Sequence, residues 1–428
     1  MSTPLKIAIA GLGTVGAGVV KMVQTHSELL ARRAGRPLEI VAVSARSRGK
    51  DRGVDLSGYA WEDDPVALAK RDDIDLFVEV MGGEDGPAKA SCEAALAAGK
   101  HVVTANKAML ALHGQPMAEL AENNKVALRF EAAVAGGIPI VKALTEGLAG
   151  NGISRVMGVM NGTCNYILTK MEATGESYTD VLKEAQALGY AEADPTVDVG
   201  GIDAAHKLSL LAATAFGTRV AFDNVEIEGI QRITLQDIKN TADMGFKIKL
   251  LGVAQQNEDG IEQRMQPCLV PTASPLGQLE GVNNMVVVEG DFIGQTVYQG
   301  PGAGEGPTAS AILGDIMDIA RGLIIPAFGQ PAAGLAQPNS SSKGSDAAYY
   351  LRFSLTDAPG TLAMLAGILG TYNVSINRMH QYGHDGKTAP LVIVTHATSR
   401  APLNAALAEI CALETSLAEP VALRIESL

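Results

Sequence analysis

A glycine-rich turn near the start of the chain constrains its fold more than any other segment. The apolar run Leu5–Ala10 leads into Gly11–Gly16, and a helical pattern continues from Thr14 to about Ala31. In a G-x-G-x-x-G turn between strand and helix, the glycines allow a tight turn, approach of a pyrophosphate and close helix–strand packing. Free N–H groups at the helix start attract phosphate. We therefore predict a dinucleotide site formed by Gly11, Leu12, Gly13, Thr14, Val15 and Gly16.

The pattern of the next hundred residues alternates between strands and helices. Strands are expected at Glu39–Val43, Asp75–Val80, His101–Thr104 and Val126–Phe130, with helices over Pro87–Ala98 and near Pro116–Asn123. This alternation predicts an α/β domain with a Rossmann-type doubly wound parallel sheet. Ligands of such sheets bind beyond the carboxyl ends of the strands. Lys107 follows one of these ends, so it is a candidate for contacting cofactor or substrate; the alternative is a surface lysine in a loop.

The loop after the second strand bears on the choice of cofactor. It reads Ser44–Lys50, with three cations and two hydroxyls, and no carboxylate precedes Asp51. An NAD site usually has an acid here for the ribose 2′-hydroxyl, whereas arginine accommodates a 2′-phosphate. We predict that Arg46 and Arg48 bind this phosphate, that NADP(H) is preferred, and that NAD(H) is an alternative cofactor. The competing interpretation is a solvated basic loop.

Charge and cysteine spacing exclude several classes of protein. The formal net charge is −13, which argues against a basic surface for nucleic acid. No apolar stretch reaches the roughly 20 residues of a membrane-spanning helix, so we expect neither a nucleic-acid nor a membrane partner. The four cysteines are far apart and form no CxxC pair. That spacing is typical of a reducing compartment, and a cytoplasmic location is expected.

The middle of the chain contains a charged cluster within Gly189–Lys207. Gly200-Gly201 precedes an apolar helix that is expected to reach about Phe216. Asp203 lies in its first turn, and Lys207 follows one turn later on the same face. Such a pair is commonly a surface ion pair, but here apolar residues follow it directly. A lysine in a partly dry cleft can act as a general acid or base, so Lys207 is a candidate catalytic residue and His206 a structural one.

Two other segments are rich in glycine, and the sequence allows two interpretations of each. Glu131–Ile140 has a single charge and forms either an ordinary tight turn or a site for a monovalent cation. Gln299–Ser310 precedes a helix expected from about Thr308 to Arg321. This segment is either a flexible crossover or a return of the chain to the dinucleotide domain, close to the nicotinamide.

Taken in order, these motifs resemble homoserine dehydrogenases over almost the whole chain. The residues that carry the resemblance are Gly11–Gly16, Ala105–Lys107, Glu131–Pro139, Asn161–Tyr166, Gly189–Lys207 and Gly300–Ser310. The family interconverts L-homoserine and L-aspartate 4-semialdehyde with NAD(P)(H), on the route to threonine and methionine. The resemblance therefore implies an oxidoreductase with these two small-molecule substrates.

The resemblance also implies a role for individual residues. Lys207 would donate the proton to the developing alkoxide, with Lys107 as its companion near the reacting oxygen. The carboxylates implied in substrate binding are Glu192, near the substrate ammonium group, together with Asp203 and Asp198. Residues implied at the cofactor are Gly189, Gly302, Gly304 and Lys107. A monovalent cation, Na⁺ or K⁺, would be held by Glu131, Val134, Gly136 and Ile138.

The C-terminal segment has a different pattern. After a Pro/Ser/Gly-rich stretch, strands and helices follow in βαββαβ order, with the turn Asp357–Leu362 after the first strand. The D-x-P-G-x-L turn and this order resemble an ACT domain, which commonly pairs with a second copy and binds an amino acid. We expect Asp357, Asn377 and Gln381 to contact an effector, L-threonine being the natural one, in a homodimer or homotetramer.

Together these patterns predict the organisation of the chain. Residues 1–130, with about 308–335, would form the dinucleotide-binding domain, and residues 131–307 an α+β domain for substrate binding, catalysis and dimerisation. Residues 336–347 would be a linker and 348–428 the regulatory ACT domain. An alternative is a catalytically silent amino-acid sensor on the same scaffold. An aspartate-semialdehyde dehydrogenase would instead need a nucleophilic cysteine, for which Cys164 is the only plausible candidate.

Overall fold

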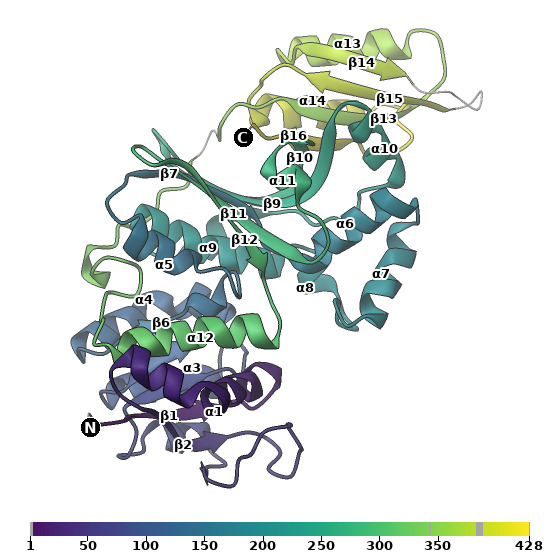
Figure 1. Ribbon diagram of the computed structural model, residues 1–428. Coiled ribbons are helices and arrows are strands. Elements are labelled where there is room, and N and C mark those ends of the chain that lie inside the picture. Colours follow the sequence, from purple (N-terminus) through teal and green to yellow (C-terminus); the bar gives the residue numbers. More distant parts are fainter. Residues whose placement is uncertain (1–2, 342–343, 382–387, 428) are drawn as a thin grey trace.

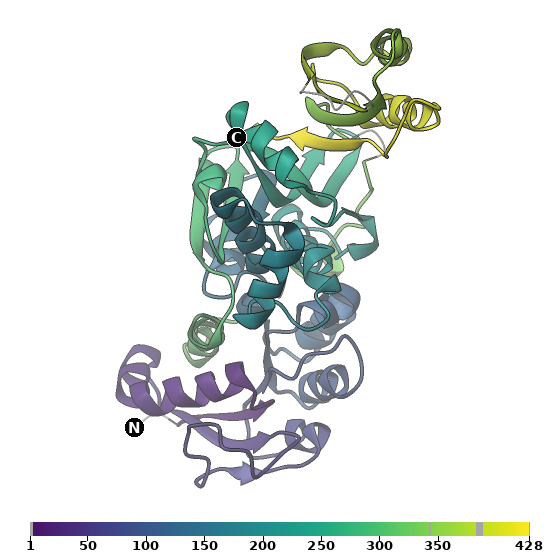
Figure 2. The ribbon, with the colours of Figure 1, turned by 90° about the vertical axis from the view of Figure 1, so that its right-hand side faces the viewer.

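The computed structural model describes residues 3–341, 344–381 and 388–427. Three parts follow one another along the molecule, and the two perpendicular views agree on their order (Figures 1 and 2). The N-terminal parallel sheet lies at one end, the C-terminal unit lies at the other, and a large mixed sheet lies between them. Within these residues no helix combines the length and the apolar character needed to cross a bilayer.

The N-terminal domain is a six-stranded parallel sheet in the order β3-β2-β1-β4-β5-β6. Its order reverses between β1 and β4, the point at which doubly wound sheets bind their ligands, so the predicted fold class is confirmed. The strands are β1 (Leu5–Ala10), β2 (Leu38–Ser44), β3 (Ala60–Trp61), β4 (Leu76–Glu79), β5 (His101–Thr104) and β6 (Leu128–Arg129). The helices are α1 (Thr14–Ala34), α2 (Pro65–Ala69), α3 (Pro87–Ala97) and α4 (Lys107–Asn123).

Helix α4 begins earlier than the sequence predicts, at Lys107 rather than near Pro116. The sequence indicates a helix only near Pro116–Asn123, whereas Pro116 lies inside α4. The actual N-cap is Asn106, whose side-chain oxygen accepts from the Met109 N–H at 3.2 Å and whose amide donates to the Gly83 carbonyl at 2.6 Å. Lys107 is therefore held in the first turn of a capped helix, directly after β5.

Helix α12 (Glu305–Ala320) packs beside α1 although the two are far apart in sequence (Figure 1). Gly18 on α1 allows this approach, because a Cβ there would lie 2.7 Å from Cγ of Glu305. The helix starts before the predicted Thr308, since β12 (Gly294–Pro301) extends into the expected turn. Only Gly302–Gly304 remains between strand and helix.

The middle part is a mixed sheet covered by helices. Its strands besides β12 are β7 (Ile153–Val159), β8 (Val225–Ile227), β9 (Phe246–Asn257), β10 (Gly260–Pro271) and β11 (Asn283–Gly290). Its helices are α5 (Ile140–Lys142), α6 (Gly162–Thr174), α7 (Tyr178–Ala187), α8 (Thr196–Val199), α9 (Ile202–Phe216), α10 (Leu235–Asp243) and α11 (Pro275–Gln278). Helix α9 is buried over most of its length, and its N-cap is Gly201 with φ of 83°. The apolar residues after Lys207 therefore anchor the charged end of α9.

The C-terminal unit has the expected βαββαβ order. It consists of β13 (Tyr349–Thr356), α13 (Thr361–Thr371), β14 (Ile376–Gln381), β15 (Thr388–Thr395), α14 (Arg400–Cys411) and β16 (Val421–Ile425). The strand order is β16-β13-β15-β14, with antiparallel neighbours. This topology confirms the predicted fold of the unit.

The sequence does not predict that the C-terminal sheet continues the middle sheet. Strand β16 pairs in parallel with β10, with Arg424 opposite Cys268 and Ile425 opposite Leu269. The segment expected to be a linker also lies along β10, where the Ser345 N–H donates to a Glu262 carboxylate oxygen at 3.0 Å. The two parts thus share one hydrogen-bonded sheet.

A buried charge cluster fastens this junction. The Glu426 carboxylate is paired with Arg155 at 2.6 Å, with Arg424 at 2.8 Å and with Arg264. Glu426 is only 3% exposed and Arg264 only 1%. Burial would raise the pKa of Glu426, but the arginines outweigh it and lower the pKa. Because lone buried charges are costly, the cluster depends on both parts being in place.

Candidate active site

Two lysines from different domains meet at one carboxylate. Lys107 Nζ, at the start of α4, lies 3.0 Å from Asp203 Oδ1, and Lys207 Nζ lies 2.8 Å from Asp203 Oδ2. Lys207 also donates to the Met160 carbonyl at 2.9 Å. Lys107, which follows β5, and the predicted i,i+4 pair of Asp203 and Lys207 on α9 are thus parts of a single cluster.

The electrostatics of this cluster favour the ionised state of Asp203. Burial would raise its pKa, but the Lys207 and Lys107 ammonium groups outweigh burial and hold the pKa well below its usual range. The Lys207 side chain is 11% exposed and the Lys107 side chain 33%. Two cations held at a sheltered carboxylate can stabilise a developing oxyanion, and an ammonium group among them can donate a proton.

Asn161 belongs to this cluster and was given no role from the sequence. Its side-chain amide donates to Asp198 Oδ1 at 2.9 Å and to Asp203 Oδ2 at 3.4 Å. Its oxygen accepts from the Cys164 N–H at 2.8 Å, which caps α6. Burial raises the pKa of Asp198, with Asp203 adding to the effect and Asn161 opposing it. An asparagine before Gly-Thr-Cys is an N-cap signal, but its second contact depends on tertiary structure.

Glu192 and Gly189 lie on the exposed segment that leads toward α8. Both residues are exposed, and Gly189 has φ of 76°. Among the described residues Glu192 forms no ion pair with either lysine. Its charge does reach Asp198, whose pKa it helps to raise. The segment therefore borders the cluster without contacting the lysines.

The glycine-rich turn has the geometry that a pyrophosphate needs. Gly11 has φ of 99°, and a Cβ there would lie 2.5 Å from the Val80 carbonyl oxygen. A Cβ on Gly16 would collide with the Gly11 carbonyl, whereas one on Gly13 meets no atom within 4 Å. No side chain caps the first turn of α1, which also contains no acidic residue. The turn thus leaves an open approach to backbone N–H groups at a helix start, so these residues fit a dinucleotide.

The basic loop is organised by an arginine that the sequence analysis did not single out. Arg52 Nε donates to the Leu12 carbonyl at 2.9 Å and Arg52 Nη1 to the Lys50 carbonyl at 2.6 Å. Its guanidinium and that of Arg48 each lie 5.7 Å from the centre of the Trp61 ring. Arg46 and Arg48 are exposed. Arg52 therefore ties the loop to the glycine-rich turn.

The turn that starts at Glu131 is buried and already uses its carboxylate. Glu131 is 2% exposed, and its two oxygens accept from the N–H groups of Val141 at 2.9 Å and Lys142 at 2.7 Å. Burial, with a contribution from Asp315, raises the pKa of Glu131 to about 7. The carboxylate is therefore a poorly solvated charge next to the turn backbone.

The two remaining glycine-rich segments pack against each other. The Gly137 N–H donates to the Pro301 carbonyl at 3.0 Å. Gly136 has φ of 53°, and its Cα lies so close to Gly302 that a Cβ would collide with the Gly302 carbonyl. The turn Gly302–Gly304 is thereby placed between the Glu131 turn and the start of α12, beside α1. Val134 and Ile138 of the Glu131 turn are both buried.

Cys164 lacks the properties of a nucleophile. It is fully buried, and its Sγ donates to the Asp198 carbonyl at 3.3 Å. Burial raises the pKa of the thiol well above its usual value, with nearby Asp198 adding to the effect. Because the thiolate is the reactive form, this environment disfavours thioester chemistry at Cys164.

The predicted effector residues separate into two groups. Asp357 and Gln381 line a cavity of about 150 Å³ beside Gly360, at the start of α13. Asn377 is not among the residues of that lining, and its side-chain nitrogen lies 3.4 Å from His396 Nδ1. Of the three predicted effector residues, Asp357 and Gln381 therefore lie at one cavity and Asn377 does not.

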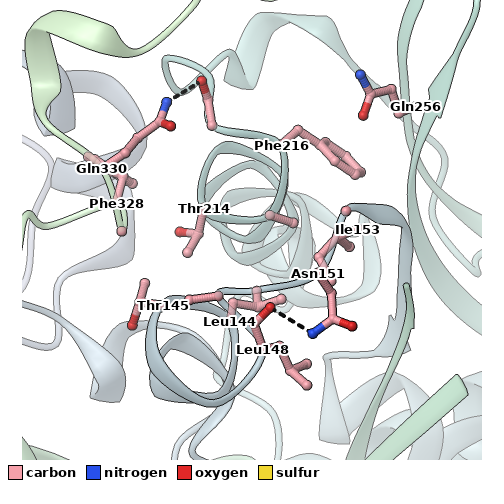
Figure 3. A pocket seen from close by; sticks show the side chains of 15 residues that line it. Leu144, Thr145, Leu148, Asn151, Ile153, Thr214, Phe216, Gln256, Phe328 and Gln330 are labelled. Carbon is pink, nitrogen blue, oxygen red and sulfur yellow. Dashed lines mark hydrogen bonds between the residues drawn. The ribbon is translucent and has the colours of Figure 1, made fainter. Parts of the chain in front are cut away.

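A further pocket lies at the opposite end of α9 (Figure 3). Leu144, Phe216 and Phe328 form apolar parts of its wall, and Asn151 and Gln330 are among its polar side chains. None of its lining residues is ionisable. It therefore has no group for proton transfer, unlike the Asp203 cluster.

Family models and related proteins all indicate the same family. A homoserine dehydrogenase family model matches residues 139–317, a model of the NAD-binding domain of homoserine dehydrogenase matches 11–131, and an ACT domain model matches 349–415. The homoserine dehydrogenase of Neisseria gonorrhoeae is 45% identical over 435 aligned residues, which cover 99% of each chain.

Solved structures agree with these matches. The crystal structure of a homoserine dehydrogenase from Thiobacillus denitrificans has a TM-score of 0.94 and 40% identity, with 99% of each chain covered. A hyperthermophilic archaeal homoserine dehydrogenase mutant in complex with NADPH has a TM-score of 0.63 and 28% identity. It matches 74% of this chain and 97% of its own.

Proposed function

The chain belongs to the homoserine dehydrogenase family, and on this premise we propose that it interconverts L-homoserine and L-aspartate 4-semialdehyde reversibly. The observation that carries the proposal is the ion-paired cluster of Lys107, Asp203 and Lys207 between two domains. The nicotinamide cofactor, when bound, supplies the hydride for the aldehyde carbon or accepts it from the alcohol.

The cluster performs the proton chemistry. In the reductive direction, Lys207 Nζ donates a proton to the aldehyde oxygen as negative charge develops there. Lys107 stabilises the same oxygen with a second positive charge, already fixed by the start of α4. Asp203 keeps both ammonium groups in position by using a separate oxygen for each. In the oxidative direction the neutral Lys207 amine takes the proton from the hydroxyl.

Three carboxylate side chains of the protein would bind the substrate. Glu192 borders the cluster from its exposed side and would bind the ammonium group of L-homoserine. Asp198 and Asp203, both bonded to Asn161, would shape the inner part of the site. Gly189 would lie near the cofactor on the same rim.

For the cofactor, NADP(H) is the preferred form and NAD(H) the alternative. The support is the loop in which Arg48 and Arg52 flank Trp61 and no acid precedes Asp51. Arg46 and Arg48 would contact the 2′-phosphate, with Arg52 holding the loop. Lys107, Gly302 and Gly304 would border the nicotinamide half.

The turn after β6 would hold a monovalent cation, Na⁺ or K⁺. The backbone carbonyls of Val134, Gly136 and Ile138 are the donors that such a hard cation prefers, and buried Glu131 supplies a negative charge next to them. The carbonyl oxygens would be the main ligands of the cation, because both Glu131 oxygens already accept hydrogen bonds from N–H groups. The cation would stabilise the turn that contacts Gly302.

Regulation and assembly complete the proposal. The ACT domain would bind an amino-acid effector, L-threonine in the first instance, near Asp357, Asn377 and Gln381, and inhibit the enzyme. The chain would act as a homodimer or homotetramer and work in the cytoplasm.

An assay with L-homoserine and NADP⁺, followed by nicotinamide absorbance, tests the activity. Turnover is expected. A folded protein that binds NADPH but turns over neither L-homoserine nor L-aspartate 4-semialdehyde would be the silent sensor instead.

A further inference from the structure

Another cavity lies where the middle part meets the C-terminal unit. Its volume is about 330 Å³. One wall is a single face of α14, with Arg400, Leu403, Asn404 and Leu407. The opposite wall includes Glu228, which follows β8 and whose N–H donates to the Met265 carbonyl of β10 at 2.8 Å. The cavity therefore has walls from two parts of the chain.

Charges of both signs line this cavity, and Glu228 and Arg400 among them do not pair with each other. Among the described residues Glu228 forms neither a hydrogen bond nor an ion pair through its carboxylate, although it is half-buried. Burial raises the pKa of Glu228, while Arg232 and Arg400 lower it and Glu419 raises it. A carboxylate left without a partner in such a place is costly, and a cationic group of a ligand would relieve that cost.

Arg400 offers the complementary group. Its Nη1 donates to Gln266 Oε1 at 2.7 Å and lies 3.5 Å from Glu226 Oε2. Both contacts involve Nη1. No other described residue contacts Nε or Nη2, so these two guanidinium nitrogens can donate to a carboxylate. Arg232 is already paired with Glu419 at 3.1 Å. Arg400 and Glu228 thus lie close enough to interact electrostatically but do not pair.

We infer that this cavity binds the zwitterion of a neutral L-α-amino acid, with its carboxylate at Arg400 and its ammonium group at Glu228. The ligand side chain would pack on Leu403 and Leu407, both on the same face of α14. This site is separate from the cavity that Asp357 and Gln381 line. The inference rests on the proposed regulation by an amino acid, and it adds a site whose ligand would contact the catalytic part and the ACT unit together.

Cys411 provides a readout that does not depend on catalysis. It lines the same cavity and is exposed, whereas Cys92, Cys164 and Cys268 are buried. In the full-length protein, the rate at which a chromogenic disulfide reagent modifies Cys411 should fall when the cavity is occupied. The reduction is about tenfold when the ligand is at about ten times its Kd, since only the free fraction reacts. Cys411→Ser identifies the modified thiol.

The probes are the neutral proteinogenic amino acids, L-threonine first, with acetate and methylamine as controls that carry one charge each. Protection by at least one amino acid, and by neither control, is expected. Glu228→Gln and Arg400→Gln should abolish this protection, whereas Asp357→Asn in the other cavity should leave it intact. These substitutions lie outside the Asp203 cluster, so basal turnover should not change.

Two results would overturn the inference. One is that none of the amino acids protects Cys411 in the wild-type protein. The other is protection that survives Glu228→Gln and Arg400→Gln or disappears in Asp357→Asn. Inhibition by L-threonine is measured on the same samples. Inhibition that persists without protection of Cys411 refutes the binding of an amino acid in this cavity and leaves the proposed regulation in place.

Discussion

Asp203 and Lys207 form an ion pair of 2.8 Å across one turn of α9, in a position where both side chains are largely shielded from water. The second oxygen of Asp203 reaches Lys107 of the other domain at 3.0 Å. One carboxylate thereby holds both ammonium groups next to each other.

Replacing Lys207 should remove the proton donor. Lys207→Ala is expected to lower kcat by roughly 10²–10⁴-fold, the usual contribution of a positioned acid–base group. The affinity for NADPH, measured by fluorescence titration, should change little because Lys207 does not contact the glycine-rich turn. Lys170→Ala, which removes only a partly exposed ion pair with Glu184, is the matched control. Near-normal turnover in Lys207→Ala would exclude the proposed role.

Asp203→Asn should destabilise the fold in a pH-dependent manner. The pKa of Asp203 is held well below its usual range, so its stabilising effect is complete above the unfolded-state pKa of about 3.9. The effect is lost progressively as the pH falls from there toward the folded-state pKa. The difference in unfolding temperature between wild type and variant should therefore be constant from about pH 8 to 5 and shrink below about pH 4. Exposed Asp72→Asn is the control, and a difference that grows in acid would contradict the ion-pair explanation.

Arg48 should determine the preference between the two cofactors, whereas Arg52 should support the binding of both. Loss of a charge-assisted contact to the 2′-phosphate is expected to reduce kcat/KM with NADPH by about 10–100-fold, from a cost of roughly 1.5–3 kcal/mol. The value with NADH should hardly change for Arg48→Ala. Arg52→Ala should lower both values, because Arg52 also binds the Leu12 carbonyl. Arg32→Ala on the exposed side of α1 serves as control, and equal losses with both cofactors in Arg48→Ala would argue against the assignment.

Glu426→Gln should weaken the junction between the middle sheet and the C-terminal unit. The substitution leaves Arg264, Arg155 and Arg424 without their shared negative charge, and breaking a buried pair costs about 3–5 kcal/mol. The first unfolding transition in a calorimetric scan should move to lower temperature. Glu289→Gln removes a partly exposed partner of Arg155 and should have a small effect. An unchanged scan for Glu426→Gln would show that the cluster contributes little.

Inhibition by L-threonine is best tested with point variants. Deletion of the residues after about 345 would remove β16 from the edge of β10 and Glu426 from its arginines, so loss of inhibition would be mixed with loss of stability. Asp357→Asn and Gln381→Ala change side chains that line the small cavity beside Gly360 and leave β16 and Glu426 in place. We expect weaker inhibition in steady-state assays with unchanged kcat. Unchanged inhibition in both variants would place the effector elsewhere.

Local sequence patterns predicted the parts of this protein whose geometry is local. The strand–turn–helix at Gly11–Gly16, the i,i+4 pair on α9 and the βαββαβ order of the C-terminal unit all follow from short-range periodicity and glycine placement. Helix ends were less predictable. A helix was expected only near Pro116–Asn123, whereas a cap by Asn106, which also binds Gly83, places the start of α4 at Lys107.

Contacts between distant segments could not be read from the sequence. Nothing near Asn161 indicates that its amide reaches Asp198 and Asp203, and nothing near Arg52 indicates that it holds the Leu12 carbonyl. Likewise, β16 resembles any terminal strand of an ACT unit, and its pairing with β10 depends on how two domains meet. Each of these contacts joins residues more than thirty positions apart, where periodicity carries no information.

The pairing of β10 with β16 has a consequence for how the chain folds. One side of β10 is covered by its hairpin partner β9, but the other is covered by short β8 and, further along, by β16. Until β16 arrives, Cys268 and Leu269 lie on an open strand edge, the kind of surface that recruits foreign strands and starts aggregation. The ACT unit therefore protects the middle sheet from edge-to-edge association, because its last strand covers this part of β10.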